Sequence, residues 1–174
     1  SEVRVRLRSD RNREGSRLDR MSMRVVQAAA FVGVGGAVLL TRRAPGVAVP
    51  AGARWPLFVA GLVLMCAGIA IRQWAVSTLG RFFTTDVRVQ PGQTVVDRGP
   101  YRWVRHPSYT GLILTFLGFG LALGNIAALA AAFLVPTAGL VYRIYFEEHA
   151  LLEGLGEPYR RYAEGRRRLV PGVW

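Results

Sequence analysis

The stretch PSYTGLILTFLGFGLALGNIAALAAAFLVPTAGLVY, from Pro107 to Tyr142, contains no charged residue along its thirty-six positions. As a single helix it would extend for about 54 Å, whereas the hydrocarbon core of a membrane is roughly 30 Å thick. The stretch must therefore turn back, and Gly124-Asn125 is the pair near its middle that favours a turn. We expect spanning helices over about 108–123 and 126–146, joined in a tight helical hairpin.

Two more uncharged runs lie upstream, Val25–Leu40 and Trp55–Ile71. Each is close to the lower length limit for a membrane-spanning helix. They predict spans over about 24–41 and 55–76, so the expected fold is an all-α integral membrane protein with about four transmembrane helices. The first run is interpreted as an anchor, because the next apolar run follows closely and no small-residue cleavage site ends it. Pro136 inside the last span predicts a kink.

The chain carries 23 basic side chains, all of them arginine, against 11 acidic ones, for a net charge of +12. This surplus alone would suggest nucleic-acid binding, which needs a basic face on a folded soluble domain. Twenty of the 23 arginines fall instead on one side of the predicted spans, within residues 1–24, 72–105 and 143–174. The positive-inside rule then places both termini and the 72–105 loop in the cytoplasm. No nucleic-acid partner is expected.

The composition also predicts the domain organisation. Residues 1–22 are expected to be a basic and mobile tail, ahead of a single membrane domain over 23–174. Arginine without lysine, together with abundant alanine, glycine and valine, is typical of a GC-rich bacterium, which suggests a bacterial inner membrane. Cys66 is the single cysteine, so an intrachain disulfide is excluded. His149 has no second histidine one helical turn away, and no metal site is predicted.

Charged residues within or beside a span are functional hypotheses, because burying them in a membrane is costly. Arg72 lies at the end of the second predicted span, where it either snorkels to the interface or binds a ligand. Gly68 lies four residues earlier on the same helical face and leaves room for a ligand or a neighbouring helix. Arg105 and His106 precede the third span, where a histidine either caps the helix or joins an anion site at its N-terminus.

Two adjacent glutamates, Glu147 and Glu148, are expected at the C-terminal end of the fourth helix. Acidic residues there oppose the helix dipole, so local stability does not explain them. They are expected either to pair with Arg72 or Arg105 or to bind the hydroxyls or amine of a polar ligand.

The order and spacing of these motifs resemble those of the isoprenylcysteine carboxyl methyltransferase family and its relatives, the phospholipid N-methyltransferases. The matching pieces are RHPSYTG at 105–111, a hairpin broken at Asn125, and RIYFEEHALLEGLGEPYRRYAEGRRRLVP at 143–171. The resemblance extends upstream through Gly68, Arg72 and LGRFF at 79–83, so it covers about residues 55–174. It implies a membrane enzyme that uses S-adenosylmethionine without a Rossmann domain, and the chain has no glycine-rich dinucleotide fingerprint.

For individual residues the resemblance implies a cofactor pocket at the cytoplasmic end of the helices. The cofactor-binding residues would be His106, Pro107, Tyr109, Gly111, Glu147, Glu148, Tyr159 and Tyr162, with Leu169 and Pro171 closing the pocket. Arg72 would face the methyl acceptor, and Arg72, Arg105 and Glu148 form the expected catalytic set. The segment LGEPYRRY at 155–162 would be a cytoplasmic helix that completes the pocket. The product would be S-adenosylhomocysteine.

O-methylation of a lipophilic carboxylate suits these residues. A carboxylate is deprotonated near neutral pH and needs no general base, and Arg72 would hold it through two parallel hydrogen bonds. The protein would chiefly supply positioning and desolvation. The acceptor would be a lipophilic small molecule or a lipidated substrate that enters from the membrane lipid. The alternatives are N-methylation of a phospholipid or other amine, an NADPH-dependent sterol-type reductase, and a non-catalytic membrane protein. The oligomeric state is left open.

Overall fold

The computed structural model describes residues 2–83, 92–172 and 174, and it describes their side chains from residue 20 onward. Within these residues the chain is helical and contains no β-strand. The α-helices are α1 (Glu2–Arg43), α2 (Ala51–Leu79), α3 (Pro107–Ala122), α4 (Ile126–Leu155) and α5 (Glu157–Glu164). Three short 3-10 helices lie between them, at Pro45–Val47, Gly80–Phe82 and Gly99–Arg102.

The predicted hairpin between α3 and α4 is confirmed. Gly124 forms the turn with a φ of 62°, a conformation that glycine adopts without a steric penalty. Asn125 caps α4, because its side-chain oxygen accepts a hydrogen bond of 3.0 Å from the amide of Ala128. Its side-chain nitrogen donates a bond of 2.8 Å to the carbonyl of Ala44. The hairpin is thereby tied to the end of α1.

Among the residues that the structure describes, three helices are long and apolar enough to cross a membrane, at Arg20–Arg43, Ala51–Phe82 and Ile126–Leu155. The span expected over 108–123 corresponds to α3, a shorter apolar helix of 16 residues that extends for about 24 Å. The helix expected to end at 146 continues, since α4 reaches Leu155. Glu147 and Glu148 therefore lie within a helix and not at its C-terminal end.

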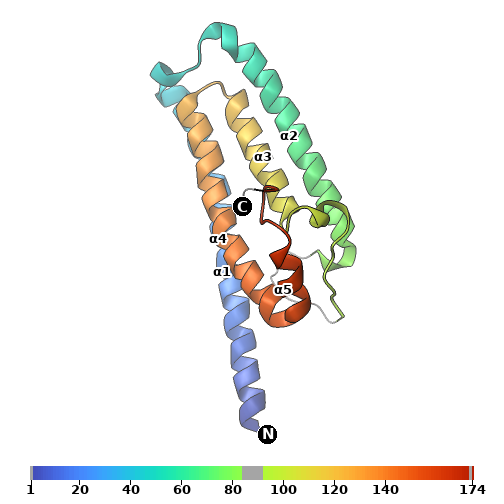
Figure 1. Cartoon of the computed structure of the whole chain (residues 1–174). Coiled ribbons are helices and arrows are strands. Elements are labelled where there is room, and N and C mark those ends of the chain that lie inside the picture. The colour runs from blue at the N-terminus through green and yellow to red at the C-terminus, as the bar shows by residue number, and fades with distance from the viewer. Residues whose placement is uncertain (1, 84–91, 173) are drawn as a thin grey trace.

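The four long helices pack side by side in the order α2, α3, α4, α1, as Figure 1 shows. The α2–α3 contact depends on glycine: a Cβ atom on Gly61 would lie 2.5 Å from the carbonyl oxygen of Gly118, and one on Gly68 would lie 2.5 Å from that of Gly111. Of the two interpretations of Gly68, the neighbouring helix is therefore confirmed. Pro136 does not interrupt α4 and packs against Gly33 of α1.

The two ends of the bundle differ in what they carry. The start of α1, the described residues 92–106 ahead of α3, and α5 all lie at one end, whereas the α1–α2 linker and the turn between α3 and α4 lie at the other (Figure 1). The predicted grouping of the arginine-rich segments at one end is thus confirmed. Residues 2–22, expected as a separate tail, belong to the same helix as the first span.

Candidate active site

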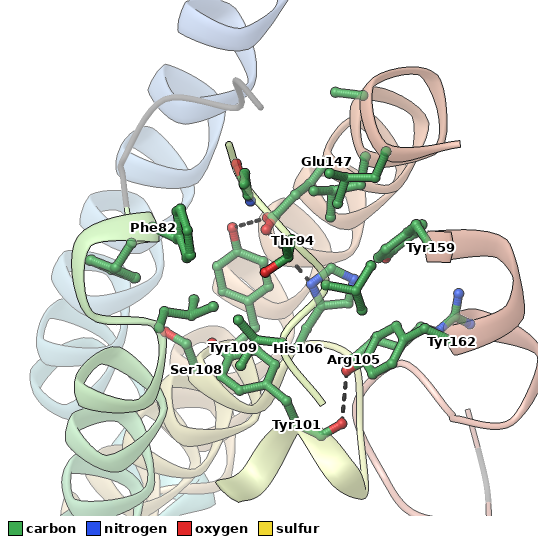
Figure 2. Close-up of a pocket in the computed structure, with 18 of the residues that line it drawn as sticks. Phe82, Thr94, Tyr101, Arg105, His106, Ser108, Tyr109, Glu147, Tyr159 and Tyr162 are labelled. Carbon is green, nitrogen blue, oxygen red and sulfur yellow. Dashed lines mark hydrogen bonds and ion pairs between the residues drawn. The ribbon is translucent and has the colours of Figure 1, made fainter. Parts of the chain in front are cut away.

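A pocket opens at the arginine-rich end of the bundle, between α3, α4, α5 and the segment that precedes α3. Its empty space is about 940 Å³, a volume that includes open solvent at its mouth. Its polar lining comes from four tyrosines, two arginines, Glu147, His106, Ser108, Gln93 and Thr94 (Figure 2). Its apolar lining includes Leu79, Phe82 and Phe83 at the end of α2. The site therefore combines charged groups with an apolar wall.

His106, Tyr109 and Glu147 point toward one another inside this pocket, as Figure 2 shows. The Tyr109 hydroxyl donates a hydrogen bond of 2.5 Å to Glu147 Oε2. His106 Nδ1 lies 4.0 Å from Glu147 Oε1, and the His106 and Tyr109 rings stack with their centroids 5.6 Å apart. These three residues, all predicted at the site, are brought together. The His106 side chain does not cap α3, so that interpretation is not supported.

Glu148 is also buried, but it is held by three cationic or ionisable groups and does not line the pocket. Its Oε1 lies 2.7 Å from Arg105 Nη1 and 3.3 Å from His106 Nε2. Its Oε2 accepts a hydrogen bond of 2.9 Å from Arg168 Nε. The expected pairing with Arg105 is thus confirmed. Glu148 joins α4 to the start of α3 and to the C-terminal segment.

The C-terminal segment 166–172 packs back onto the start of α3. The amides of Arg105 and His106 donate hydrogen bonds of 2.8 Å and 2.9 Å to the carbonyls of Arg167 and Arg168. The guanidinium of Arg168 lies 5.3 Å from the Tyr145 ring and 5.1 Å from the Trp174 ring. Such cation–π contacts add to the salt bridge with Glu148. The segment is held by its backbone as well as by Arg168.

Tyr159 and Tyr162 of α5 form one wall of the pocket. The Tyr162 hydroxyl donates a hydrogen bond of 2.8 Å to the carbonyl of Tyr101. Burial raises the pKa of Tyr162 to about 12, and burial also raises the pKa of Tyr159. Both phenols are therefore protonated at physiological pH and act as neutral donors.

Arg72 lies beside the pocket and is not part of its lining. Its Nη1 donates a hydrogen bond of 2.9 Å to the hydroxyl of Ser108, and Ser108 does line the pocket. Arg72 therefore reaches the site through Ser108 in this conformation.

Four more of the residues expected at the cofactor site do not line the pocket, and three of them have packing roles here. Pro107 is buried at the first turn of α3, and Gly111 packs against Gly68. The carbonyl of Leu169 accepts a hydrogen bond of 2.8 Å from the Thr110 hydroxyl. Pro171 is exposed.

The structure adds lining residues that the sequence did not assign to the site: Tyr101, Ser108, Arg143 and the segment 93–96. The sequence contained a feature that could have identified Arg143 as a site residue. It is a charged residue inside an expected span, one helical turn before Glu147, and the same criterion singled out Arg72. No sequence feature could have identified segment 93–96, because its place in the lining depends on how the chain crosses the pocket.

The fold and the site together define an all-α integral membrane protein with a charged, tyrosine-rich pocket at one end of its apolar helices. The Isoprenylcysteine carboxyl methyltransferase (ICMT) family matches residues 61–153. This match covers more than half of the chain, and the chain belongs to that family. The predicted resemblance is confirmed.

The relatives and the solved structure agree with this assignment. A probable protein-S-isoprenylcysteine O-methyltransferase of Oryza sativa subsp. indica is 34% identical over 112 residues, which cover 63% of this chain and 59% of that protein. The uncharacterized protein YpbQ of Bacillus subtilis (strain 168) is 32% identical over 99 residues, or 57% of this chain and 58% of that protein. The structure of the eukaryotic intramembrane Ras methyltransferase ICMT superposes with a TM-score of 0.69 at 28% identity, covering 84% of this chain and 52% of that one.

The chain spans only about three fifths of the length of these sequence relatives. What they do as whole proteins is therefore a separate question from the shared family.

Proposed function

We propose that this protein transfers a methyl group from S-adenosylmethionine to the carboxylate of a lipophilic acceptor. The observation that carries the proposal is the pocket itself, where Glu147, four tyrosines and two arginines gather at the end of apolar helices. Membership of the isoprenylcysteine carboxyl methyltransferase family supports the reaction class.

The residues present suit S-adenosylmethionine, which has a sulfonium, an ammonium, a carboxylate and an adenosine group. Glu147 supplies a carboxylate for the positive groups or the ribose hydroxyls, and the tyrosine rings offer flat surfaces for the adenine. Arg105 Nε is buried without a hydrogen-bond partner among the described residues, so a donor remains for an anionic group. When bound, the cofactor would supply the methyl group on its sulfonium.

The chain's own residues would act by positioning and by excluding water. Glu147 is oriented by the Tyr109 hydroxyl, and Glu148 orients Arg105 and His106. Because an acceptor carboxylate is already deprotonated at neutral pH, none of these side chains needs to remove a proton. Their contribution would be to hold the two reactants in line in a site with little water.

The apolar wall fits a lipophilic acceptor. Leu79, Phe82 and Phe83 follow directly from the long apolar α2, so an acyl or prenyl chain in the membrane would reach the pocket along this side. Arg105 and Arg143 line the same pocket and favour an acceptor anion over an amine cation. We place the pocket on the cytoplasmic side of a bacterial inner membrane, because the arginine-rich segments lie at its end of the bundle.

The first test measures cofactor binding to the purified protein in detergent. We expect the wild-type protein to bind S-adenosylhomocysteine, and Glu147→Gln to weaken its affinity about tenfold, because it loses a charged hydrogen-bond acceptor at the pocket. The matched control is Glu153→Gln on the same helix, whose carboxylate is exposed and pairs with His149 at 3.4 Å. This control should bind like the wild type.

The second test supplies radiolabelled S-adenosylmethionine with a panel of lipid acids and lipid amines. Label in the acids supports O-methylation, whereas label in the amines alone would replace it with N-methylation. NADPH consumption without methyl transfer would overturn the reaction class.

A further inference from the structure

A pair of exposed tryptophans lies outside the pocket, where α2 meets the segment that precedes α3. Trp74 of α2 and Trp103, which follows the 3-10 helix Gly99–Arg102, are in edge-to-face contact with their ring centroids 5.6 Å apart. Each of the two is 46% exposed. The guanidinium of Arg102 lies 4.3 Å from the Trp103 ring centroid. We call Trp74, Arg102 and Trp103 the tryptophan–arginine surface.

The spacing of the tryptophans along α2 places this surface at a membrane interface. Trp55 is 71% exposed and lies nineteen residues before Trp74 in the same helix, a separation of about 29 Å along a helix axis. The hydrocarbon core of a membrane is roughly 30 Å thick, and tryptophan is enriched at both of its boundaries. Trp55 and Trp74 therefore fit the two boundaries, and the Trp74–Trp103 pair lies at the one nearer the pocket.

Arg102 gives this surface a positive charge that the protein does not neutralise. Its side chain is exposed and has no hydrogen bond or salt bridge with any residue that the structure describes. Asp97, the acidic residue nearest to it in the chain, lies 3.8 Å from Arg166. A guanidinium that stacks on an indole ring keeps its N–H donors at its edge, where they can bind a phosphate through two parallel hydrogen bonds.

The tryptophan–arginine surface is separate from the pocket, since none of its three residues lines it. The residue between the two is Tyr101, which is buried and does line the pocket. The carbonyl of Tyr101 accepts a hydrogen bond of 2.8 Å from Tyr162, so this segment is fixed from the inside by α5. Its exposed residues, Arg102 and Trp103, are left to contact what surrounds the protein.

We propose that the tryptophan–arginine surface binds an anionic phospholipid, with the phosphate on Arg102 and the start of the acyl chains against Trp74 and Trp103. The membrane supplies this partner, because α2 is long and apolar enough to cross it. Anionic lipids attract basic residues near the membrane surface, and the flat rings of tryptophan suit the boundary between headgroups and acyl chains. This proposal does not depend on methyl transfer.

The experiment measures quenching of tryptophan fluorescence by lipids that carry bromine on their acyl chains. The full chain with Trp55→Phe and Trp174→Phe retains Trp74 and Trp103, so its emission reports on this surface alone. It is reconstituted into mixed vesicles of phosphatidylglycerol and phosphatidylcholine, with bromine first on one lipid and then on the other. We expect brominated phosphatidylglycerol to quench with a relative affinity about two- to fivefold higher, the effect of one basic residue at an anionic surface.

Arg102→Gln in the same background tests the headgroup contact. It should abolish the preference for phosphatidylglycerol and leave quenching by both lipids intact, because the rings still face acyl chains. The matched control is Arg54→Gln, which removes an exposed arginine beside Trp55 at the other end of α2. It should keep the full preference. Raising the salt concentration with Arg102 present should reduce the preference, since ions screen exposed charges.

The outcomes decide the proposal without any cofactor. If neither brominated lipid quenches Trp74 and Trp103, lipid does not cover this surface and a second protein chain takes its place, which overturns the proposal. If both lipids quench equally, or if the preference survives Arg102→Gln, the surface contacts acyl chains without a headgroup site and the proposal is wrong. Loss of S-adenosylhomocysteine binding would overturn the proposed function and leave this inference standing.

Discussion

At the scale of residues, Glu147 and Glu148 show how neighbours in the chain take different tasks. Successive residues of a helix point about 100° apart. Glu147 consequently faces the pocket and Tyr109, whereas Glu148 faces Arg105, His106 and Arg168. Glu148 is therefore proposed to hold the site together, and Glu147 to contact the cofactor.

Glu148→Gln should destabilise the protein by about 1–3 kcal/mol, because a neutral amide replaces the charged acceptor of two arginines. Chemical denaturation in detergent micelles would measure the loss. Hydrogen exchange would locate it, since the amides of Arg105 and His106, which bond to the C-terminal segment, should exchange faster. Glu153→Gln, on the exposed face of the same helix, is the control and should stay within about 0.5 kcal/mol. Unchanged exchange at these two amides would contradict the role given to Glu148.

At the scale of elements, α2 and α3 approach each other through small residues at heptad spacing. The buried positions of α2 are Gly61, Gly68 and Ala75, each seven residues from the next. They face α3 in antiparallel order, with Gly61 against Gly118 and Gly68 against Gly111. Small residues let two membrane helices pack closely, because lipid supplies no hydrophobic force between them. This contact fixes the start of α3, where His106 and Tyr109 lie.

Gly118→Ala should weaken the α2–α3 contact by about 1–3 kcal/mol, because the new Cβ would lie 2.5 Å from the carbonyl oxygen of Gly61. Thermal unfolding in micelles would report a lower transition temperature. The control is Gly35→Ala in α1, where nothing lies within 4 Å of the added Cβ. Alanine favours a helix over glycine, so this control should be neutral or slightly stabilising. Equal transition temperatures for the two variants would contradict the packing argument.

The boundaries of α4 show where reading helices from the sequence went wrong. The predicted span ended at 146 because charged residues follow, but the helix continues to Leu155. An uncharged run marks the part of a helix that fits the hydrocarbon region, and the hydrogen-bonded helix extends beyond it. The extra turns place Leu151 and Leu155 in the pocket wall. The bounds predicted for α3, about 108–123, agree within one residue with the observed Pro107–Ala122, because the Gly124-Asn125 turn marks its end.

At the scale of the whole molecule, the arginine-rich segments lie at one end of the bundle (Figure 1). The residues that line the pocket belong to the same end. The positive-inside rule predicts that this end faces the cytoplasm. Both the soluble cofactor and the lipophilic acceptor would then meet at the cytoplasmic interface.

Cysteine labelling tests this orientation in intact cells. In a Cys66→Ala background, Gly46→Cys lies in the linker between α1 and α2, and Gly165→Cys follows α5 at the other end of the bundle. Both positions are exposed and have open space around an added Cβ, so both should react when reached. A membrane-impermeant maleimide should label Gly46→Cys in intact cells and Gly165→Cys only after permeabilisation. The reverse pattern would place the pocket on the outer side.

The sequence by itself determined the membrane class, the hairpin at Gly124-Asn125, the grouping of arginines at one end, and the family. Each of these depends on local composition or on motifs that are close in the chain. Several site residues followed as well, because RHPSYTG and the adjacent glutamates keep His106, Tyr109 and Glu147 in fixed local positions.

Only the tertiary structure decided which charges meet. Arg72 and Arg143 are both charged residues beside or within a span, and the sequence assigned the ligand role to Arg72. Helix packing turns Arg143 into the pocket and gives it Ser22 as a partner. Arg72 stays outside the lining and bonds to Ser108, which is part of it. The physical reason is that the rotation of each helix and the distance between helices determine which groups a side chain can reach. Glycine contacts set both here, and neither is encoded in a local motif.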